Sequence, residues 1–216
     1  MSPAVVALGW TPIRGTRWLD ADAFDLDGAG VPGDRLYSAV TPDLTCVKAM
    51  KHPELFAWVA DRSLPADGGR PASVTYWGRS FAALVWEDKI AASLSEVLGE
   101  RVLLARADER PGFIWDCPIS LITTSELAGL SGPLGRYRAN VVLDDTDAPV
   151  PLRAGERVAL GEAVLELVRP IERCVLIDRN PFDGGPLPPM LPRLGPAVTL
   201  GWGCRVVRAG RVGVQS

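Results

Sequence analysis

The chain has 216 residues, of which 47% are hydrophobic and 23% are charged. This composition supports a packed core and excludes a disordered chain, and the length fits one large domain or two small ones. The 23 Lys and Arg residues against 26 Asp and Glu residues give a formal net charge of −3. Nucleic acid is therefore a poor candidate partner, since nucleic-acid-binding surfaces carry an excess of basic residues.

No stretch reaches the 18 apolar residues of a membrane span, and the start of the chain lacks the pattern of an export signal. We therefore expect a cytoplasmic protein that has no membrane partner. The four cysteines, at positions 46, 117, 174 and 204, lack the short paired spacing of zinc or iron–sulfur sites. A disulfide framework is also disfavoured without export, so each thiol is interpreted alone.

Short segments that are rich in Val, Leu, Ile and Trp, and bounded by Gly, Pro or Asp, predict a mainly β fold, either a barrel or a sandwich. The predicted strands are 3–10, 17–26, 35–41, 72–77, 81–86, 101–106, 119–123, 139–144, 157–160, 163–169, 174–178 and 202–208. In the segment 17–26, aspartates recur near alternate positions. This pattern is typical of a strand with one face in water.

A few short helices are expected between these strands. Pro53 can begin one, since proline is favoured at the first helical position. Asp88 is the predicted N-cap of a second helix, which Gly99 ends. A third, shorter helix is predicted to begin at Thr124 or Ser125.

The composition changes around residues 107–112, which indicates a boundary inside the chain. We expect an N-terminal β-rich half over 1–110 and a second half over 111–216 that carries Cys174, the two halves packing intimately. One continuous domain is the alternative, because a half of this size buries little surface alone. The proline- and glycine-rich segment 183–196 predicts an irregular loop, a candidate lid.

Cys174 is the best candidate for a reactive thiol. It lies at the junction of two extended runs, next to Arg173 and near Arg169, and neighbouring arginines favour the thiolate that binds soft metals. The local sequence also fits a buried cysteine at the beginning of a strand. The residues alone leave both interpretations open.

Arg138 and Asn140 fall on one side of an entering strand. A guanidinium group suits phosphate or carboxylate, and an amide can both donate to and accept from a heterocycle. The glycines at 28, 30 and 33 resemble a dinucleotide fingerprint, but a predicted strand follows them where that fingerprint requires a helix. We therefore exclude a Rossmann site.

Six stretches together resemble, in order and approximate spacing, the MOSC family, the domain shared by molybdenum cofactor sulfurase C-terminal regions and the amidoxime-reducing component. They are Trp10–Gly15, Gly30–Arg35, Ile119–Ser125, Tyr137–Asn140, Val168–Cys174 and Arg205–Gly210. The chain differs from the family pattern at Gly15, Ala139, Leu176 and Ile177, and near Gly203. The cation at Arg14 and the amide at Asn140 are kept.

The resemblance implies a MOSC-like β-barrel that binds a pyranopterin molybdenum cofactor. It implies that Cys174 is the metal's protein ligand and the catalytic residue. It also implies cofactor contacts at the matching positions, which are Arg14, Arg35, Thr124, Ser125, Arg138, Asn140 and Arg173.

Three functions follow as hypotheses. The first is a molybdenum-dependent oxidoreductase that reduces N-oxygenated or similar small molecules. Its electrons would come from a separate flavin or iron–sulfur partner, because the scattered cysteines cannot hold a cluster. The second is a sulfurtransferase, sulfur carrier or cofactor carrier that uses a Cys174 persulfide. The third is a non-catalytic module that binds an anionic small molecule.

The remaining cysteines, Cys46, Cys117 and Cys204, are interpreted as structural, as is His52, which precedes the helix beginning at Pro53. The seven tryptophans are dispersed along the chain and are not aligned with basic residues. We therefore expect them to pack in the core and at the barrel ends rather than to form a stacking platform.

Overall fold

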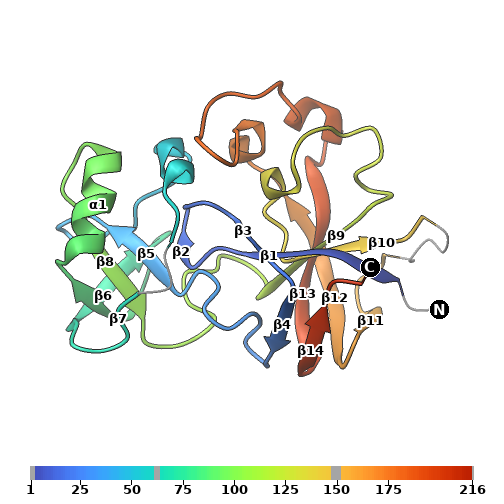
Figure 1. Ribbon diagram of the computed structural model, residues 1–216, viewed down its shortest axis with the longest axis horizontal. Coiled ribbons are helices and arrows are strands. Elements are labelled where there is room, and N and C mark those ends of the chain that lie inside the picture. Colours follow the sequence, from blue (N-terminus) through green and yellow to red (C-terminus); the bar gives the residue numbers. More distant parts are fainter. Residues whose placement is uncertain (1–2, 61–63, 147–151, 216) are drawn as a thin grey trace.

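A computed structural model of the protein describes residues 3–60, 64–146 and 152–215. The fold is mainly β, as predicted, and contains three sheets (Figure 1). The strands are β1 (Ala4–Trp10), β2 (Ile13–Arg14), β3 (Leu19–Ala21), β4 (Ala23–Leu26), β5 (Tyr37–Val40), β6 (Arg70–Tyr76), β7 (Arg79–Trp86), β8 (Leu103–Ala107), β9 (Ile119–Thr123), β10 (Val141–Asp144), β11 (Arg157–Leu160), β12 (Ala163–Glu172), β13 (Thr199–Arg208) and β14 (Gly210–Gly213).

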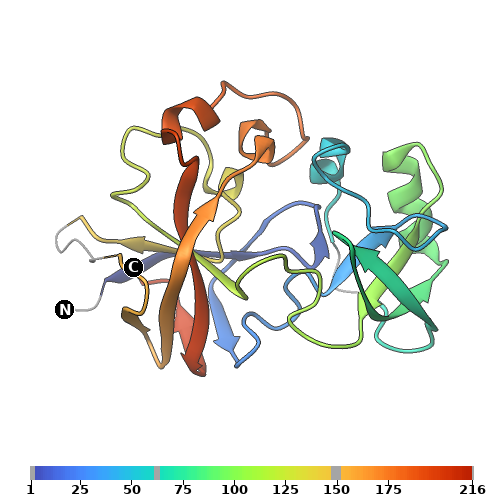
Figure 2. The same ribbon diagram turned by 180° about the vertical axis from the view of Figure 1, so that it is seen from behind.

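The largest sheet has seven strands in the order β11-β12-β13-β9-β10-β1-β3, and only its β9–β10 pair is parallel. A five-stranded sheet has the order β2-β5-β8-β7-β6, and β4 pairs with β14 in a small third sheet. Within the described residues these sheets remain open and do not close into the expected barrel. The view from behind shows the two larger sheets beside each other (Figure 2).

Buried apolar side chains alternate with more exposed residues along the strands, so that one face of each sheet packs against a core. In β12, Ala163, Leu165 and Leu167 are buried, and the residues between them are partly exposed. One core cluster lies between the seven-stranded sheet and the β4–β14 pair. Two further clusters pack on the five-stranded sheet. Each large sheet therefore has its own core.

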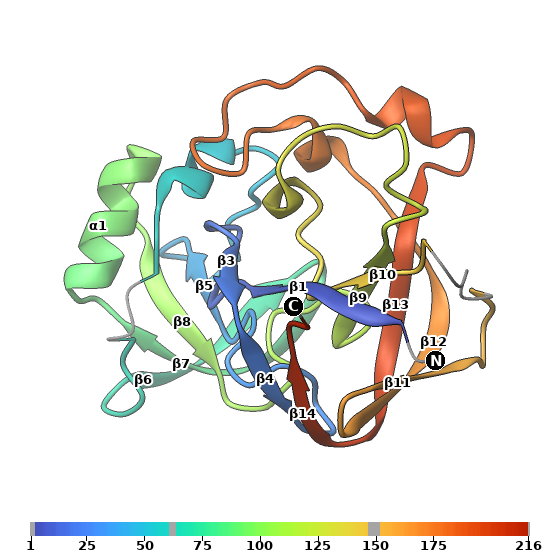
Figure 3. The same ribbon diagram turned by 45° about the vertical axis from the view of Figure 1, so that its right-hand side comes forward.

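The one α-helix within the described ranges, α1 (Lys89–Leu98), lies on the outer side of the five-stranded sheet (Figure 3). The Asp88 carboxylate accepts hydrogen bonds from the backbone N–H groups of Ile90 and Ala91, and Gly99 ends the helix with a left-handed φ of 66°. Both ends were predicted from the sequence. No helix in the part of the chain described here is long and apolar enough to cross a membrane.

Single turns of 3-10 helix make up the rest of the helical structure. They are η1 (Pro53–Ala57), η2 (Leu134–Arg136), η3 (Val175–Asp178) and η4 (Leu191–Leu194). The first follows Pro53 as expected, with His52 outside it. The last lies inside the proline-rich segment, which is otherwise irregular.

The predicted strand over 174–178 is wrong. Cys174 has extended backbone, but the next four residues form η3. Ile177 is buried, whereas Val175 is exposed, and the Asp178 carboxylate accepts a hydrogen bond from the Met190 N–H group at 2.6 Å. A short apolar run fits a helical turn as well as a strand, and these contacts select the turn.

Two further expectations fail for related reasons. The segment after Thr124 forms turns rather than a helix, because Thr124 and Ser125 bond to Asp145 instead of to a helical backbone. The segment 17–26 is not one strand: β3 pairs with β1, and β4 pairs with β14. The chain changes sheet at Asp22.

We expect the substitution Asp88→Ala to lower the free energy of unfolding by about 1 kcal/mol, because two N–H groups at the beginning of α1 lose their acceptor. Urea denaturation followed by circular dichroism measures this. Glu96→Ala, at an exposed position of the same helix, should change stability by much less. Equal losses in the two variants would contradict the assigned cap.

Candidate functional site

A cavity of about 620 Å³ lies between the two large sheets. Arg14 of β2 and Tyr76 of β6 line it from the five-stranded sheet. Ser120 of β9, Gly203 of β13 and the end of β12 line it from the seven-stranded sheet. We call this space the central cavity. Its volume is within the range of small-molecule and cofactor sites.

Five of the predicted site residues line the central cavity, and they come from distant parts of the chain. They are Arg14, Arg35, Arg138, Arg173 and Cys174. Cys174 is exposed and is a free thiol. It is thus not sealed in an apolar core, the alternative that its local sequence left open. Its position between β12 and η3 makes it part of the cavity wall.

Arg138 lies three residues before the start of β10, with a left-handed φ of 52°. Its guanidinium group is 4.7 Å from the centroid of the Phe56 ring, and Nη2 donates to Thr11 Oγ1 at 3.2 Å. The buried Nη1 atom has no hydrogen-bond partner among the described residues. Burial, together with the neighbouring Arg35 cation, lowers the pKa of Arg138 to about 9.

Arg173 is held by two backbone carbonyl groups. Nε donates to Leu200 O at 2.7 Å, and Nη1 donates to Tyr137 O at 2.8 Å. Its buried Nη2 atom likewise has no hydrogen-bond partner in the described part of the chain. Burial lowers the pKa of Arg173 to about 10. The nearby Glu126 carboxylate offsets part of this lowering. Among the described residues, neither Arg138 nor Arg173 forms an ion pair, and each has one guanidinium nitrogen without a hydrogen-bond partner.

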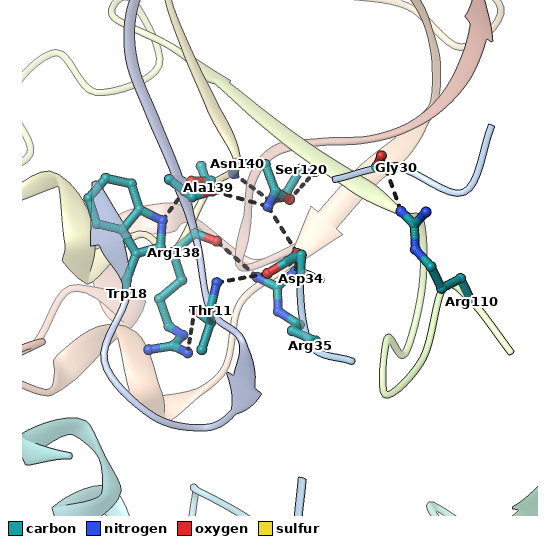
Figure 4. Close-up of polar contacts among 11 residues, drawn as sticks. Thr11, Trp18, Gly30, Asp34, Arg35, Arg110, Ser120, Arg138, Ala139 and Asn140 are labelled. Atoms are coloured by element: carbon teal, nitrogen blue, oxygen red, sulfur yellow. Dashed lines mark hydrogen bonds and ion pairs between the residues drawn. The ribbon is translucent and has the colours of Figure 1, made fainter. Parts of the chain in front are cut away.

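The third arginine of this group, Arg35, is paired. Its Nη1 atom donates to Asp34 Oδ2 at 2.7 Å, and Nη2 donates to the Arg138 carbonyl oxygen at 3.3 Å (Figure 4). Asp34 is buried, and its other oxygen accepts from the Thr11 N–H group at 2.8 Å. The carboxylate of Asp34 thus forms an ion pair with Arg35, and it favours the charged form of Arg138 without pairing with it.

Asn140 is not part of the lining of the central cavity. It forms hydrogen bonds that connect the segments carrying the lining residues. Its Oδ1 atom accepts from the backbone N–H and the hydroxyl of Ser120, and Nδ2 donates to Gly9 O and Asp34 Oδ2. All four hydrogen-bonding positions of the amide are filled. The expected cofactor contact at Asn140 therefore has no free donor or acceptor, and the residue instead joins β1, β9 and Asp34 (Figure 4).

Thr124 and Ser125 are also absent from the cavity lining. Thr124 donates to Asp144 and Asp145, and the Ser125 hydroxyl donates to Asp145 at 2.6 Å. These hydroxyl groups hold the turn after β9 against the end of β10. We do not carry the two residues into the candidate site.

Several lining residues were missed by the sequence analysis. Lys48, Trp77 and Trp115 line the central cavity, and so does Arg169, which the sequence analysis named only as a neighbour of Cys174. Of the tryptophans, which were expected in the core and at the barrel ends, Trp77 and Trp115 are 38% and 55% exposed and so do not pack in the core. Only Trp77 had a local sequence signal: Trp77 and Gly78 are two residues between two strands, which is the length of a β-hairpin turn, and such a turn exposes its side chains.

Of the cysteines interpreted as structural, Cys46 and Cys204 are buried. Burial raises the pKa of Cys46 to about 11 and raises that of Cys204 further. Cys117 instead lines the central cavity, where burial and the adjacent Asp116 raise its pKa to about 11. These three thiols stay protonated at neutral pH.

Positively charged side chains outnumber acidic ones in the lining of the central cavity. Six cationic residues line it, and the acidic lining residues are Asp116 and Glu172. Arg169 donates to Asp116 at 2.6 Å, so that acid is already neutralised. No cluster of three or more His, Cys, Asp or Glu side chains that could hold a metal ion occurs within the described residues. The site therefore suits an anion beside a single thiol.

The fold is similar to that of solved structures of other proteins. No curated protein matches the chain. A crystal structure of the YuaD protein from Bacillus subtilis is similar, with a TM-score of 0.51 and 12% sequence identity over 99% of this chain and 92% of that chain. A likeness at this identity shows the fold alone. A crystal structure of YiiM from Geobacillus stearothermophilus gives a TM-score of 0.34 and 18% identity over 45% of this chain and 51% of that one.

The family model described as "MOSC domain" matches residues 108–216, just over half of the chain. The match includes Arg138, Arg173 and Cys174 of the central cavity. Arg14 and Arg35 reach the same cavity from outside the matched segment. The chain belongs to the MOSC domain family.

Proposed function

We propose that the central cavity binds a molybdenum cofactor, that Cys174 is the protein ligand of the metal, and that the protein is an oxidoreductase of N-oxygenated or similar small molecules. The MOSC family is associated with molybdenum cofactor binding, which supports a role connected with this cofactor. The substrate class rests on the resemblance to the amidoxime-reducing component.

The observation that carries the proposal is a pair of buried guanidinium nitrogens without hydrogen-bond partners, one on Arg138 and one on Arg173, beside an exposed thiol. A buried charge without a partner costs free energy, so such groups persist where a ligand compensates them. A pyranopterin cofactor carries a phosphate group, which guanidinium groups bind through paired hydrogen bonds. The two free N–H groups are the donors that an anion of this kind would use.

The set of metal donors is consistent with a cofactor that brings its own ligands. The described part of the cavity wall holds Cys174 and Cys117 and no larger cluster of metal-binding side chains. A soft thiolate ligand suits a soft metal centre. Cys117 is a poor metal ligand, because its raised pKa keeps the thiol protonated.

When bound, the molybdenum centre would supply two-electron redox chemistry. The chain's own residues would perform the other tasks. Cys174 fixes the metal end of the cofactor, the arginines neutralise its negative charge, and the hydrogen bonds of Asp34 hold Arg35 against the Arg138 backbone. Electrons would come from a separate flavin or iron–sulfur protein, because the four cysteines of this chain are unpaired and dispersed.

We expect Cys174→Ser to lose most of its bound molybdenum, at least tenfold relative to wild type, because a neutral hydroxyl is a much poorer ligand than a thiolate. The measurement is elemental mass spectrometry on protein purified from a host that synthesises the cofactor.

Cys117→Ser is the matched control, since it removes the other thiol of the cavity and should keep its molybdenum. Unchanged metal in Cys174→Ser would overturn the ligand assignment. A persulfide on Cys174 in a wild-type protein that holds no metal would favour a sulfur carrier instead.

We expect Arg138→Met to reduce cofactor content several-fold without unfolding the protein. The substitution keeps a long side chain against Phe56 but removes the charge that burial disfavours. The cofactor-free variant should therefore melt no lower than cofactor-free wild type. Molybdenum analysis and differential scanning calorimetry measure the two effects.

Arg169→Met is the control for Arg138→Met. Arg169 lines the same cavity but is largely exposed and already paired with Asp116, so its loss should change cofactor content by less than twofold. Equal losses of cofactor in the two variants would show that general positive charge, rather than the buried Arg138 cation, retains the cofactor.

A further inference from the structure

Part of the wall of the central cavity is aromatic, on the side of the five-stranded sheet. Tyr76, at the end of β6, contacts Phe81, Phe113 and Trp115 edge to face, with ring centroids 6.1 to 6.4 Å apart. Phe113 is fully buried and anchors the loop that carries Trp115. The aromatic cluster thus extends from a buried core to the exposed rim of the cavity.

Trp77 and Trp115 form this rim. Their ring centroids are 5.6 Å apart and their planes meet at 55°. With Met50, also 38% exposed, they bring exposed apolar surface to a cavity whose charged lining residues are mostly cations. Large exposed apolar groups that gather at a concave site mark ligand-binding surfaces. We call Trp77 and Trp115 the rim pair.

The backbone at Trp77 is strained. Trp77 and Gly78 are the two residues of the turn between β6 and β7, and both have positive φ, 50° and 76°. Turns of this kind favour Asn, Asp or Gly at the first position. A bulky side chain there costs about 1 kcal/mol or more. Such strain is common where a side chain serves a ligand, and here it presents the indole at the cavity.

Two cations hold the rim pair. Lys48 Nζ lies 4.2 Å from the Trp77 ring centroid, and the Arg79 guanidinium lies 4.9 Å from that of Trp115. Arg14 stacks in the same way on Tyr76, at 4.6 Å. A ring that enters between these groups would contact indole faces and edges in a positive field. This environment favours a planar ring that carries negative charge and disfavours a cation.

We propose that the rim pair is the substrate subsite of the central cavity, and that the substrate is a planar aromatic small molecule with a negatively charged group. The assignment of this ligand as substrate rests on the proposed function. The ring lies against Trp77 and Trp115 at the entrance, and the negative group is directed toward the arginines. Cys174, Arg138 and Arg173 would hold the cofactor at another part of the wall of the same cavity.

The test uses 2-naphthoate, which has a planar ring system and one carboxylate, and isothermal titration calorimetry with wild-type protein that carries its cofactor. Cyclohexanecarboxylate has the same charge without the aromatic ring, and 2-naphthyltrimethylammonium has the ring with the opposite charge. We expect 2-naphthoate to bind at least fivefold more tightly than either. Equal affinity for the three probes would overturn the proposal.

Trp115→Leu should weaken 2-naphthoate binding by about three- to tenfold, the size of an aromatic contact, and Trp115→Phe should restore most of the affinity. Phe182→Leu is the matched control, because Phe182 is a similarly exposed aromatic residue, at 53%, outside the cavity lining. An equal effect of Phe182→Leu and Trp115→Leu would overturn the assignment. Tight binding of single-stranded oligothymidylate, together with no binding of 2-naphthoate, would also overturn the assignment, because the stacked ring would then be a nucleic-acid base.

Molybdenum content measured on the same samples separates this proposal from the proposed function. We expect Trp115→Leu to retain its molybdenum while it loses affinity for 2-naphthoate. Loss of molybdenum in Trp115→Leu would show that the rim pair holds the cofactor, which overturns the subsite. Wild-type protein that binds 2-naphthoate through Trp115 and never contains molybdenum would overturn the proposed function but leave the aromatic-anion site.

Discussion

The arrangement of the central cavity depends on positive charge that the protein does not neutralise by itself. Arg138 and Arg173 each have a buried guanidinium nitrogen without a partner, and burial lowers the pKa of both side chains. In the free protein this charge opposes folding. An anion bound in the cavity would make these charges stabilise the folded state, because it would give each cation the partner that it lacks. Ligand binding and stability are therefore coupled at this site.

A network of buried polar groups keeps Arg35 and Arg138 in place. Asp34 and Asn140 connect the segment before β5, the strands β1 and β9, and the segment before β10 (Figure 4). Arg35 and Arg138, which extend from two of these segments, both have left-handed backbone. Satisfied buried networks fix a single geometry, because each member would be costly to leave unpaired. The network thus offsets local strain and sets the distance between the two arginines.

Local sequence patterns correctly predicted those elements whose ends are determined by neighbouring residues in the chain. The ends of α1 follow from Asp88 and Gly99, and the strands over 119–123 and 157–160 have the predicted bounds. The predicted strand after Cys174 failed, because hydrogen bonds to Asp178 from another part of the chain decide between a strand and a helical turn. Within the described residues, the expected barrel does not form either. Which distant strands pair cannot be predicted from the local sequence of any one segment.

The site shows the same division. The resemblance to a family predicted that one site contains Arg14, Arg35, Arg138, Arg173 and Cys174, and all five line the central cavity. Resemblance could not show that Asn140 has all its hydrogen bonds filled inside the protein. It also could not show that Trp115 faces the cavity, because which side a loop residue faces depends on how the two sheets pack. These properties appear only when the contacts are known.

The most direct test of this account is a crystal structure of the protein purified from a host that makes the molybdenum cofactor. We predict a phosphate group within hydrogen-bonding distance of Arg138 Nη1 and Arg173 Nη2, and anomalous density for molybdenum next to Cys174 Sγ. A cofactor bound elsewhere, or a cavity in which those two nitrogens bind only water while the metal is present, would contradict the central claim.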